Sequence, residues 1–307
     1  MTLTPTTPSP RAGQRLGSVA VIGTGAMGGG VVESLVRAGV ATRAHDIDPA
    51  AQARAVQLGA QPARCAAAAV AQAEAVIVLV VTAEEVDAVL FGTDGVVGAM
   101  PRGGVVIVSS TVDPDYLTAL APRLAAAGLE LVDAPVSGGP AKAAAGTMTM
   151  MIAGNPVACA RVEPTLAAIT GRLFVVGPRA GEAAMVKIVN NLLAAANLAA
   201  GAEALALARR AGLDARQVAD IIAASSGASW IFGDRVERAL TGDLAPRAAT
   251  RVLLKDVGIA VDVARRLRTS SRFAEAAQAA FAAAVAAGHA EDDDAAMFVH
   301  AEQTGHP

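Results

Sequence analysis

The sequence predicts an α/β domain built on a parallel sheet, followed by an all-α domain, with one long helix joining the two. Short β-branched or apolar runs alternate with helical patterns over the first half of the chain, as in parallel sheets. The second half contains helical patterns only. Between the halves, residues 182–211 form a helical pattern without a proline, about 45 Å long at 1.5 Å per residue. We therefore expect a tail over residues 1–16, a first domain over 17–180 and a second over 181–307.

The composition excludes several classes of protein. The 307 residues suffice for two domains, and a net charge of −3 gives no electrostatic argument for nucleic-acid binding. Every largely apolar stretch of 18 or more residues contains a charged or an amide side chain, so no membrane span is predicted. The two cysteines, Cys65 and Cys159, lack metal-ligand spacing and fit a reducing cytoplasm, and the four histidines are scattered. We therefore expect no metal site. The tail is rich in Pro and Thr and has no apolar segment of the kind found in signal peptides, so we expect it to be disordered.

A glycine-rich turn links the first predicted strand, residues 18–22, to a helix over 27–38. Gly23, Gly25 and Gly28 form the pattern GxGxxG in the strand–turn–helix context of a dinucleotide-binding, Rossmann-type domain. The first glycine permits the tight turn, the second lets the backbone approach a pyrophosphate, and the third lets the helix pack closely on the strand. The predicted cofactor-binding residues of this turn are Gly23, Thr24, Gly25, Ala26, Met27 and Gly28.

An acidic residue follows the second predicted strand, residues 41–45. Asp46 lies 18 residues after Gly28 and can accept hydrogen bonds from the adenine-ribose hydroxyls of a dinucleotide. Together with Asp48 it puts negative charge where a 2′-phosphate would bind, which favours NAD over NADP. The alternative role for Asp46 is that of a helix N-cap, but Asp48, directly before Pro49, fits that role better.

Two further strands end in polar or small residues. Residues 75–81 form an apolar strand before a helix over 84–90, and residues 104–109 form the next strand before a helix that begins at Pro114. Ligands of open parallel sheets bind outside the carboxyl ends of the strands. The predicted walls of the cofactor site are therefore Val80, Val81, Thr82 and Thr111. The alternative for the Ser-Ser-Thr run at 109–111 is ordinary helix capping.

A strand over 130–133 leads into a Ser-Gly-Gly loop. Ser137, Gly138 and Gly139 offer a hydroxyl and consecutive N–H groups that can bind a carboxylate; the alternative is a plain turn between two strands. Further elements are a strand over 147–153, a helix over 156–169 and a strand over 173–176. The helices expected after the long one cover residues 214–224, 230–240, 248–268 and 273–287, and we expect the acidic run 291–294 to cap a last helix.

The long helix carries an unusual polar patch near its start. Lys187, Asn190 and Asn191 share one helical face among apolar residues, where polar groups carry a desolvation cost unless they find partners. This pattern indicates a catalytic patch, or else a lysine that reaches solvent beside two amides bonded to the backbone.

These motifs in this order resemble the β-hydroxyacid dehydrogenases related to 3-hydroxyisobutyrate dehydrogenase. The resemblance rests on GTGAMG, Ser110-Thr111, DAPVSGG at 133–139, KIVNN at 187–191 and Lys255-Asp256. Within the family, the segments at 90–95, 227–235, 240–246 and 288–295 are most similar to the L-threonate dehydrogenases. The resemblance implies NAD-dependent oxidation of a small hydroxy acid in a cleft between the domains.

The resemblance also implies roles for single residues. Lys187 would be the catalytic acid/base, oriented with the substrate by Asn190 and Asn191. Lys255 would reach the cofactor or substrate. The substrate-binding residues it implies are Ser137, Gly138, Gly139, Trp230 and Phe232.

Other functions remain open beside the oxidation of L-threonate. Within the family they are 3-hydroxyisobutyrate dehydrogenase and tartronate semialdehyde reductase. Outside the family, one alternative is a non-catalytic NAD-binding sensor, which would need Lys187 or the Ser-Gly-Gly loop to be altered, and both are intact. The other is an imine reductase, against which Lys187 and Asp46 argue. The apolar content of the second domain predicts a homodimer or homotetramer.

Overall fold

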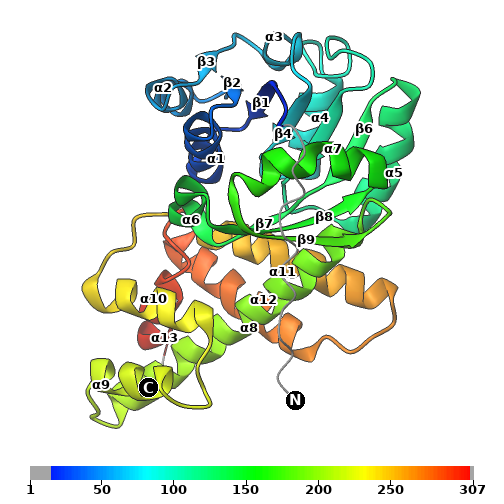
Figure 1. Cartoon of the computed structure of the whole chain (residues 1–307). Coiled ribbons are helices and arrows are strands. Elements are labelled where there is room, and N and C mark those ends of the chain that lie inside the picture. Colours follow the sequence, from blue (N-terminus) through cyan, green and yellow to red (C-terminus); the bar gives the residue numbers. More distant parts are fainter. Residues whose placement is uncertain (1–14, 305–307) are drawn as a thin grey trace. The chain divides into compact units, whose positions relative to one another are not determined.

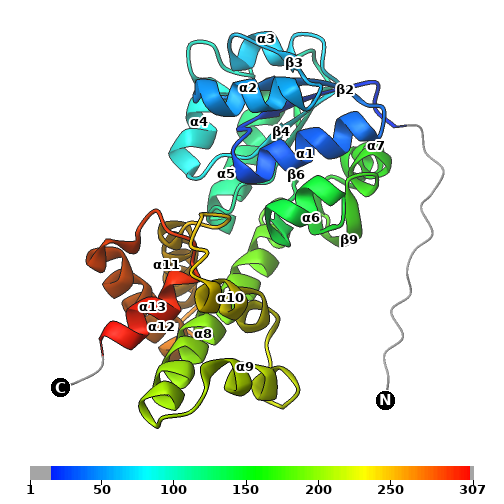
Figure 2. The ribbon, with the colours of Figure 1, turned by 90° about the vertical axis from the view of Figure 1, so that its left-hand side faces the viewer.

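The computed structural model describes residues 15–304 and divides into two compact units, which are described separately. One unit ends at Lys187 and the other begins at Ile188. Figures 1 and 2 show the chain from two directions with its helices and strands labelled. The first unit contains β1 (Ser18–Ile22), α1 (Ala26–Arg37), β2 (Ala41–His45), α2 (Pro49–Gln57), β3 (Gln61–Pro62), α3 (Ala66–Val70), β4 (Ala75–Val78), α4 (Ala83–Phe91), β5 (Val105–Val108), α5 (Pro114–Ala126), β6 (Glu130–Asp133), β7 (Val136–Ser137), α6 (Gly139–Ala145), β8 (Met148–Gly154), α7 (Pro156–Ala167), β9 (Thr170–Gly177) and the start of α8 (Glu182–Arg210).

The strands of the first unit form one sheet in the order β3-β2-β1-β4-β5-β6-β8-β7, with β9 paired to β8. The pairs from β3 to β6 are parallel, whereas β8 runs antiparallel to β6 and β7. The predicted Rossmann-type sheet is thereby confirmed. The predicted strand over 75–81 is too long, because β4 ends at Val78. Beyond that point the N–H of Val80 donates to Ser110 Oγ at 3.0 Å rather than to a neighbouring strand.

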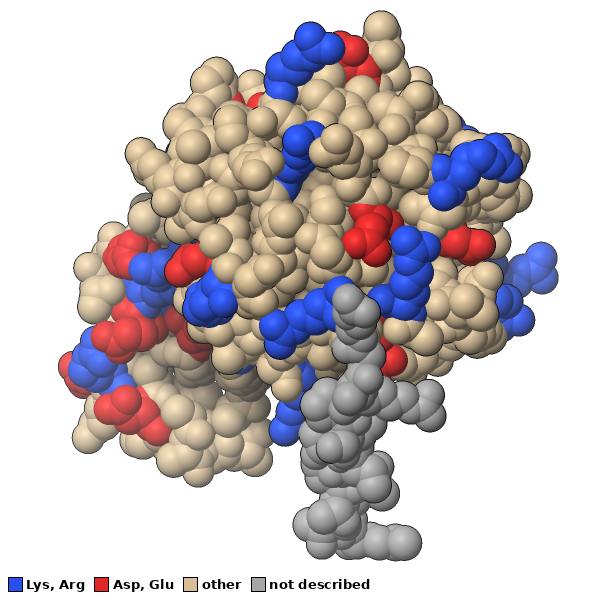
Figure 3. All heavy atoms as spheres, turned by 45° about the horizontal axis from the view of Figure 1, so that its top comes forward, with Lys and Arg blue, Asp and Glu red and all other residues tan. Residues whose placement is uncertain are grey.

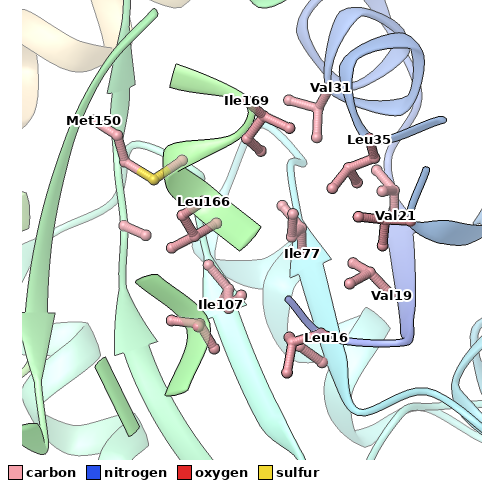
Figure 4. Packing of buried hydrophobic residues seen from close by; sticks show 14 of the residues in the cluster. Leu16, Val19, Val21, Val31, Leu35, Ile77, Ile107, Met150, Leu166 and Ile169 are labelled. Carbon is pink, nitrogen blue, oxygen red and sulfur yellow. The ribbon is translucent and has the colours of Figure 1, made fainter. Parts of the chain in front are cut away.

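Two apolar layers cover the sheet, one on each face. On one face, α1 and α7 pack on side chains such as Val21, Ile77 and Met150, as Figure 4 shows. On the other face, α3, α4 and α5 pack on the alternate side chains of the same strands, including Val76 and Val106. Every residue of β4 and β5 is buried, which explains why these strands are continuous apolar runs in the sequence.

In its described residues the second unit consists of helices joined by loops, with one isolated β-bridge between Ala249 and Asp293 and no strand. After the rest of α8 it contains α9 (Ala215–Ala223), α10 (Trp230–Thr241), α11 (Thr250–Arg266), α12 (Arg272–Ala284), the π-helical turn η1 (Val285–His289) and α13 (Ala296–Gln303). Its core combines many alanines with a few aromatic rings, among them Phe232, Phe281 and Phe298. Small residues let the helices approach closely: a Cβ on Gly201 of α8 would lie 2.5 Å from the Phe232 ring. The predicted all-α second half is confirmed.

The acidic run 291–294 does not cap α13, so this prediction is wrong. The N-cap of α13 is Ala295, and no side chain caps the helix. Asp293 and Asp294 are buried instead and form ion pairs with two arginines of α10. Asp293 pairs with Arg238 at 3.1 Å, and Asp294 pairs with Arg235. Buried carboxylates require such partners, and this requirement outweighs the preference of acidic residues for a helix start.

Two remaining expectations concern the ends of the chain and its longest helix. The predicted disordered tail lies outside the described residues except for its last two, of which Leu16 is buried and donates its N–H to Thr165 Oγ1 at 2.9 Å.

Among residues 15–304, α8 is long and apolar enough to cross a membrane by length and composition alone. Core helices pass the same test, and 44% of its most apolar window is buried, so this is weak evidence for a span.

Candidate functional site

The glycine turn after β1 has the geometry that a dinucleotide-binding turn requires. Gly23 has φ +86°, and its N–H donates to His45 O at 3.0 Å. A Cβ on Gly23 would lie 2.4 Å from Leu79 O, and a Cβ on Gly28 would lie 1.9 Å from Gly23 O. Neither position can accept a side chain, because the atoms in the way belong to the backbone. The turn and the start of α1 are thus packed against each other.

Gly25, between these two residues, faces open space. A Cβ built on it would meet no atom within 4 Å. It is the N-cap of α1, and no side chain within residues 15–304 accepts a hydrogen bond from the free N–H groups of the first turn, which also carries no acidic residue. A helix start of this kind binds phosphate through its N–H groups and its dipole. The residues present therefore fit the pyrophosphate of NAD.

Asp46 lies beside this turn. Its Oδ2 accepts the N–H of Thr24 at 2.5 Å, and its Oδ1 accepts the N–H of Asp48 at 2.9 Å. A carboxylate has about four acceptor positions, so the half-buried Asp46 keeps acceptor capacity for ribose hydroxyls. The N-cap role belongs to Asp48, whose side chain accepts the N–H groups of Ala50 and Ala51 in α2. The choice of Asp48 as the capping residue is confirmed.

The next two strands end near one another at the same edge of the sheet. The bond from Val80 to Ser110 Oγ joins the chain after β4 to the chain after β5. Thr82 caps α4 in a capping box with Glu85, so its hydroxyl is engaged in the protein. The capping alternative for the run 109–111 is wrong, because Asp113 caps α5 by accepting the N–H of Asp115.

The Ser-Gly-Gly loop connects β7 to a short helix, α6, that the sequence did not predict. Gly138 and Gly139 have φ values of +131° and +76°, a conformation that L side chains rarely adopt. The plain turn between two strands is therefore excluded, since α6 begins at Gly139, the last residue of the loop. The packing of α6 on α1 was not predicted either: Ser34 Oγ donates to Ala143 O at 2.6 Å, and a Cβ on Gly30 would lie 2.6 Å from Ala144 N. The helices α1 and α6 are thus packed directly against each other.

The polar patch of α8 is largely buried. The Lys187 side chain is buried at 9% exposure, and Asn191 is buried whereas Asn190 is exposed. Asn190 Nδ2 donates to Asn191 Oδ1 at 3.1 Å, and Asn191 Nδ2 donates to Asp256 Oδ2 at 2.7 Å. Because a carboxylate only accepts hydrogen bonds, Asp256 fixes the orientation of both amides. The side-chain oxygen of Asn190 then remains available as an acceptor.

Asp256 also contacts the second lysine of the predicted site. Lys255 Nζ lies 2.7 Å from Asp256 Oδ1, which has no other partner among the described residues. One buried carboxylate of α11 therefore holds Asn191 with one oxygen and Lys255 with the other. Asp256 is not among the residues predicted for the site, although it directly follows Lys255 in the motif.

The two aromatic residues predicted to line the substrate pocket differ in environment. Trp230 is 56% exposed at the start of α10. Phe232 is 2% exposed and packs edge-on against Phe298, with ring centroids 5.8 Å apart. Phe232 is enclosed by the core of the helical unit and therefore supports the position of α10. Of the two residues, Trp230 is the one whose side chain is accessible to a ligand.

On the face drawn in Figure 3, basic and acidic side chains are interspersed, without a broad patch of one sign. Across residues 15–304, no three His, Cys, Asp or Glu side chains are grouped so that they could hold a metal ion.

Two family models match nearly the whole chain. A model of the NAD-binding domain of 6-phosphogluconate dehydrogenase matches residues 18–177. A model described as the NAD-binding region of NADP-dependent 3-hydroxyisobutyrate dehydrogenase matches residues 181–300. Both descriptions name a nicotinamide dinucleotide, which confirms the predicted cofactor class.

Individual proteins agree with these models. L-Threonate dehydrogenase of Cupriavidus necator is 43% identical over 280 residues, which cover 91% of this chain and 94% of that protein. The crystal structure of 3-hydroxyisobutyrate dehydrogenase from Salmonella typhimurium has a TM-score of 0.87 and 38% identity, covering 92% of this chain and 99% of that one. The structure of Psf3 in complex with NADP+ and 2-OPP has a TM-score of 0.85 and 27% identity, with coverages of 92% and 99%. The chain therefore belongs to the 3-hydroxyisobutyrate dehydrogenase family of NAD-dependent hydroxyacid dehydrogenases, as the order of its motifs predicts.

Proposed function

We propose that this enzyme oxidises L-threonate to its 2-oxo acid with NAD, using Lys187 as the acid/base. The observation that carries the chemistry is the buried Lys187 together with an amide pair, one helical turn further along α8, that is anchored on the buried carboxylate of Asp256. A buried lysine followed by two ordered amides is costly in a purely structural helix. The choice of L-threonate is supported by the name and the 43% identity of the C. necator relative.

The proposed reaction divides the two hydrogens of a secondary alcohol between two acceptors. NAD, when bound, accepts the hydride from the carbon. Lys187, in its neutral form, takes the hydroxyl proton from a distance of about 3 Å, which is the reach of a general base. In the reverse direction the ammonium of Lys187 donates this proton to the carbonyl oxygen. The side-chain oxygen of Asn190 accepts a hydrogen bond from a substrate hydroxyl, because the amide chain to Asp256 holds it in that orientation.

The substrate carboxylate binds in this proposal to the loop of Ser137, Gly138 and Gly139. Both glycines have positive φ, and successive N–H groups in such a turn can converge on an anion. Lys255 neutralises charge on the cofactor or the substrate, and Trp230 covers the apolar side of the bound molecule. The loop carries no acidic residue that would repel a carboxylate.

A panel of substrates distinguishes this proposal from its alternatives. NAD reduction would be followed by the absorbance of the reduced nicotinamide with L-threonate, D-erythronate, 3-hydroxyisobutyrate and glycerate, and repeated with NADP. Rapid NAD-dependent turnover of L-threonate alone is expected. Turnover of only 3-hydroxyisobutyrate or glycerate would keep the family chemistry and replace the substrate by that of 3-hydroxyisobutyrate dehydrogenase or tartronate semialdehyde reductase. No turnover with retained NAD binding would favour the sensor.

The role of Lys187 has its own test. Lys187→Ala is expected to lower kcat by about 10²-fold or more while NADH affinity stays near that of the wild type. Lys187→Arg is the matched control, since a guanidinium keeps the positive charge but does not deprotonate near neutral pH. Near-normal turnover by either variant would show that another group moves the proton.

We further propose that the enzyme works in the cytoplasm as a homodimer or homotetramer. Large apolar side chains exposed on the helical unit support self-association, among them Leu207 at 71% and Phe273 at 80% exposure. Sedimentation equilibrium would measure the assembly state, and a monomer at micromolar concentration would contradict it.

A further inference from the structure

A carboxylate buried in the first unit is bonded to the start of the helix that carries Lys187. Asp133 is the last residue of β6 and has no exposed surface. Its Oδ2 accepts the N–H of Gly181, directly before α8, and the N–H of Ala184, in the first turn of α8, both at 2.9 Å. These bonds span 48 and 51 residues of sequence. Asp133 therefore connects the carboxyl end of a central strand to α8.

The first turn of α8 is fixed by more than this carboxylate. A Cβ on Gly181, which has φ +97°, would lie 2.6 Å from Pro114 O of α5. Thr118 Oγ1, also on α5, lies 3.1 Å from Ala180 O, where it can donate a hydrogen bond. Ala183 packs in a small buried cluster of the first unit. The helix start is therefore enclosed, and Asp133 supplies its charged anchor.

The carboxylate of Asp133 carries a cost that a purely structural cap would avoid. Burial raises its pKa to about 6, although the N–H groups of the first turn of α8 oppose this shift and Glu182 adds to it. Its Oδ1 is buried without a hydrogen-bond partner among the described residues. A neutral acceptor would hold the turn at a smaller desolvation cost. Retaining a charge at this point is understandable if the position of α8 matters more than the stability it costs.

Asp133 also stands at the start of the segment that leads to the Ser-Gly-Gly loop. Only three residues separate it from Ser137, and Lys187 lies three residues beyond Ala184, less than one turn along α8. One side chain thus connects the strand that leads to the loop with the helix that carries the lysine. A displacement of about 1 Å between reacting groups can lower a rate by about 10²-fold.

We propose that Asp133 is a positioning residue that sets the location of Lys187 relative to the loop of Ser137, Gly138 and Gly139. The proposal rests on the proposed role of Lys187 as acid/base. Asp133 touches neither substrate nor cofactor in this scheme. It acts through the first turn of α8, so its loss displaces the lysine while the glycine turn at β1 and the residue Asp46 remain in place.

The test compares two variants of Asp133 with a control that removes another buried hydrogen bond from the same unit. Asp133→Ala removes both acceptors, and Asp133→Asn keeps one acceptor oxygen without the charge. Thr165→Val is the control. Thr165 lies on α7, and its substitution removes the acceptor for the N–H of Leu16 and leaves α8 untouched. For each protein we would measure Tm, the stoichiometry and Kd of NADH binding, kcat per bound NADH, and the isotope effect with substrate deuterated at the oxidised carbon.

The expected result separates positioning from stability. Asp133→Ala should lower kcat per NADH site by about 10- to 100-fold, with an increased isotope effect and an NADH Kd within about twofold of the wild type. Asp133→Asn should lie between it and the wild type. Thr165→Val should lower Tm but keep kcat and the isotope effect. If Asp133→Ala does not fold, Asp133→Asn decides alone, and a wild-type kcat and isotope effect in that variant overturn the proposal.

The failure of this proposal is distinguishable from the failure of the proposed function. If Lys187→Ala is inactive while both Asp133 variants keep full kcat, Asp133 is an ordinary structural residue and the role of Lys187 stands. If Lys187→Ala keeps its turnover, the acid/base assignment fails, and a decrease in the Asp133 variants would then reflect another group on α8.

Discussion

Gly25→Ala should separate cofactor binding from stability at the glycine turn. Gly25 has a negative φ of −57°, and a methyl group on it would meet no protein atom within 4 Å. The substitution therefore introduces no steric clash among the described residues of the free protein. It fills the space through which a pyrophosphate would approach the N–H groups of α1. Loss of one charge-assisted hydrogen bond of about 1.5–3 kcal/mol corresponds to an NAD affinity lower by about 10- to 100-fold.

Two neighbouring glycines provide matched controls. A Cβ on Gly29 would lie 3.4 Å from Thr24 O, an ordinary contact, so Gly29→Ala should keep NAD affinity and raise stability by about 0.5–1 kcal/mol. A Cβ on Gly28 would lie 1.9 Å from the backbone oxygen of Gly23. Gly28→Ala should therefore cost stability, by about 1–3 kcal/mol or more, as overpacked sites do.

The assay combines urea unfolding of the free proteins with titration of NADH fluorescence. Gly25→Ala is expected to unfold like the wild type and to bind NADH weakly. If Gly25→Ala binds NADH with wild-type affinity, the open space above this residue is not where the pyrophosphate lies. If it unfolds much more easily, the steric argument itself is wrong.

Three further outcomes are expected. Because burial raises the pKa of Asp133 from an ordinary value of 3.8 to about 6, its stability contribution is present below pH 3.8 and is lost as pH rises through 6. At about 1.4 kcal/mol per pKa unit the loss is about 3 kcal/mol. The stability of Asp133→Asn relative to the wild type should therefore rise by about that amount between pH 3 and pH 7, and urea unfolding that gives the same stability difference between the two proteins at both pH values would contradict this. Asp46→Ser should raise the KM for NAD by about tenfold and weaken discrimination against NADP, and an unchanged KM ratio of the two cofactors would remove Asp46 from the ribose site. Arg235→Met should lower stability by about 3–5 kcal/mol, because Asp294 is left buried without its main partner, and a thermal melt like that of the wild type would refute the role of this pair.

Local patterns predicted the secondary structure well where they were strong. The strands β4 and β5 are fully buried, so they are apolar throughout, and α8 is free of proline over its whole length. The short helix α6 was missed because Pro140 and flanking glycines obscure its seven residues. The glycine turn was predicted from its spacing, and its backbone geometry agrees with that reading. The individual substrate and catalytic residues stay predictions.

The features that could not be predicted depend on long-range partners. Asp133 looks like the polar end of a strand, but its hydrogen bonds lie 48 and 51 residues away. Asp256 reaches Asn191 across 65 residues, and Asp294 reaches Arg235 across 59. In the sequence each of these carboxylates resembles a solvated charge. Only the folded chain shows that they are buried, because their partners come from other elements.

The bonds from Asp133 to α8 have a consequence for recombination among relatives. The two family models meet between residues 177 and 181, which invites a chimaera that exchanges everything after residue 177. In such a chimaera the first turn of α8 would come from one parent, and the carboxylate that accepts its hydrogen bonds would come from the other. A crossover after Lys187 keeps donor and acceptor from the same parent. Exchange of substrate specificity between members of this family should therefore succeed more often when the crossover lies inside α8 than when it lies ahead of the helix.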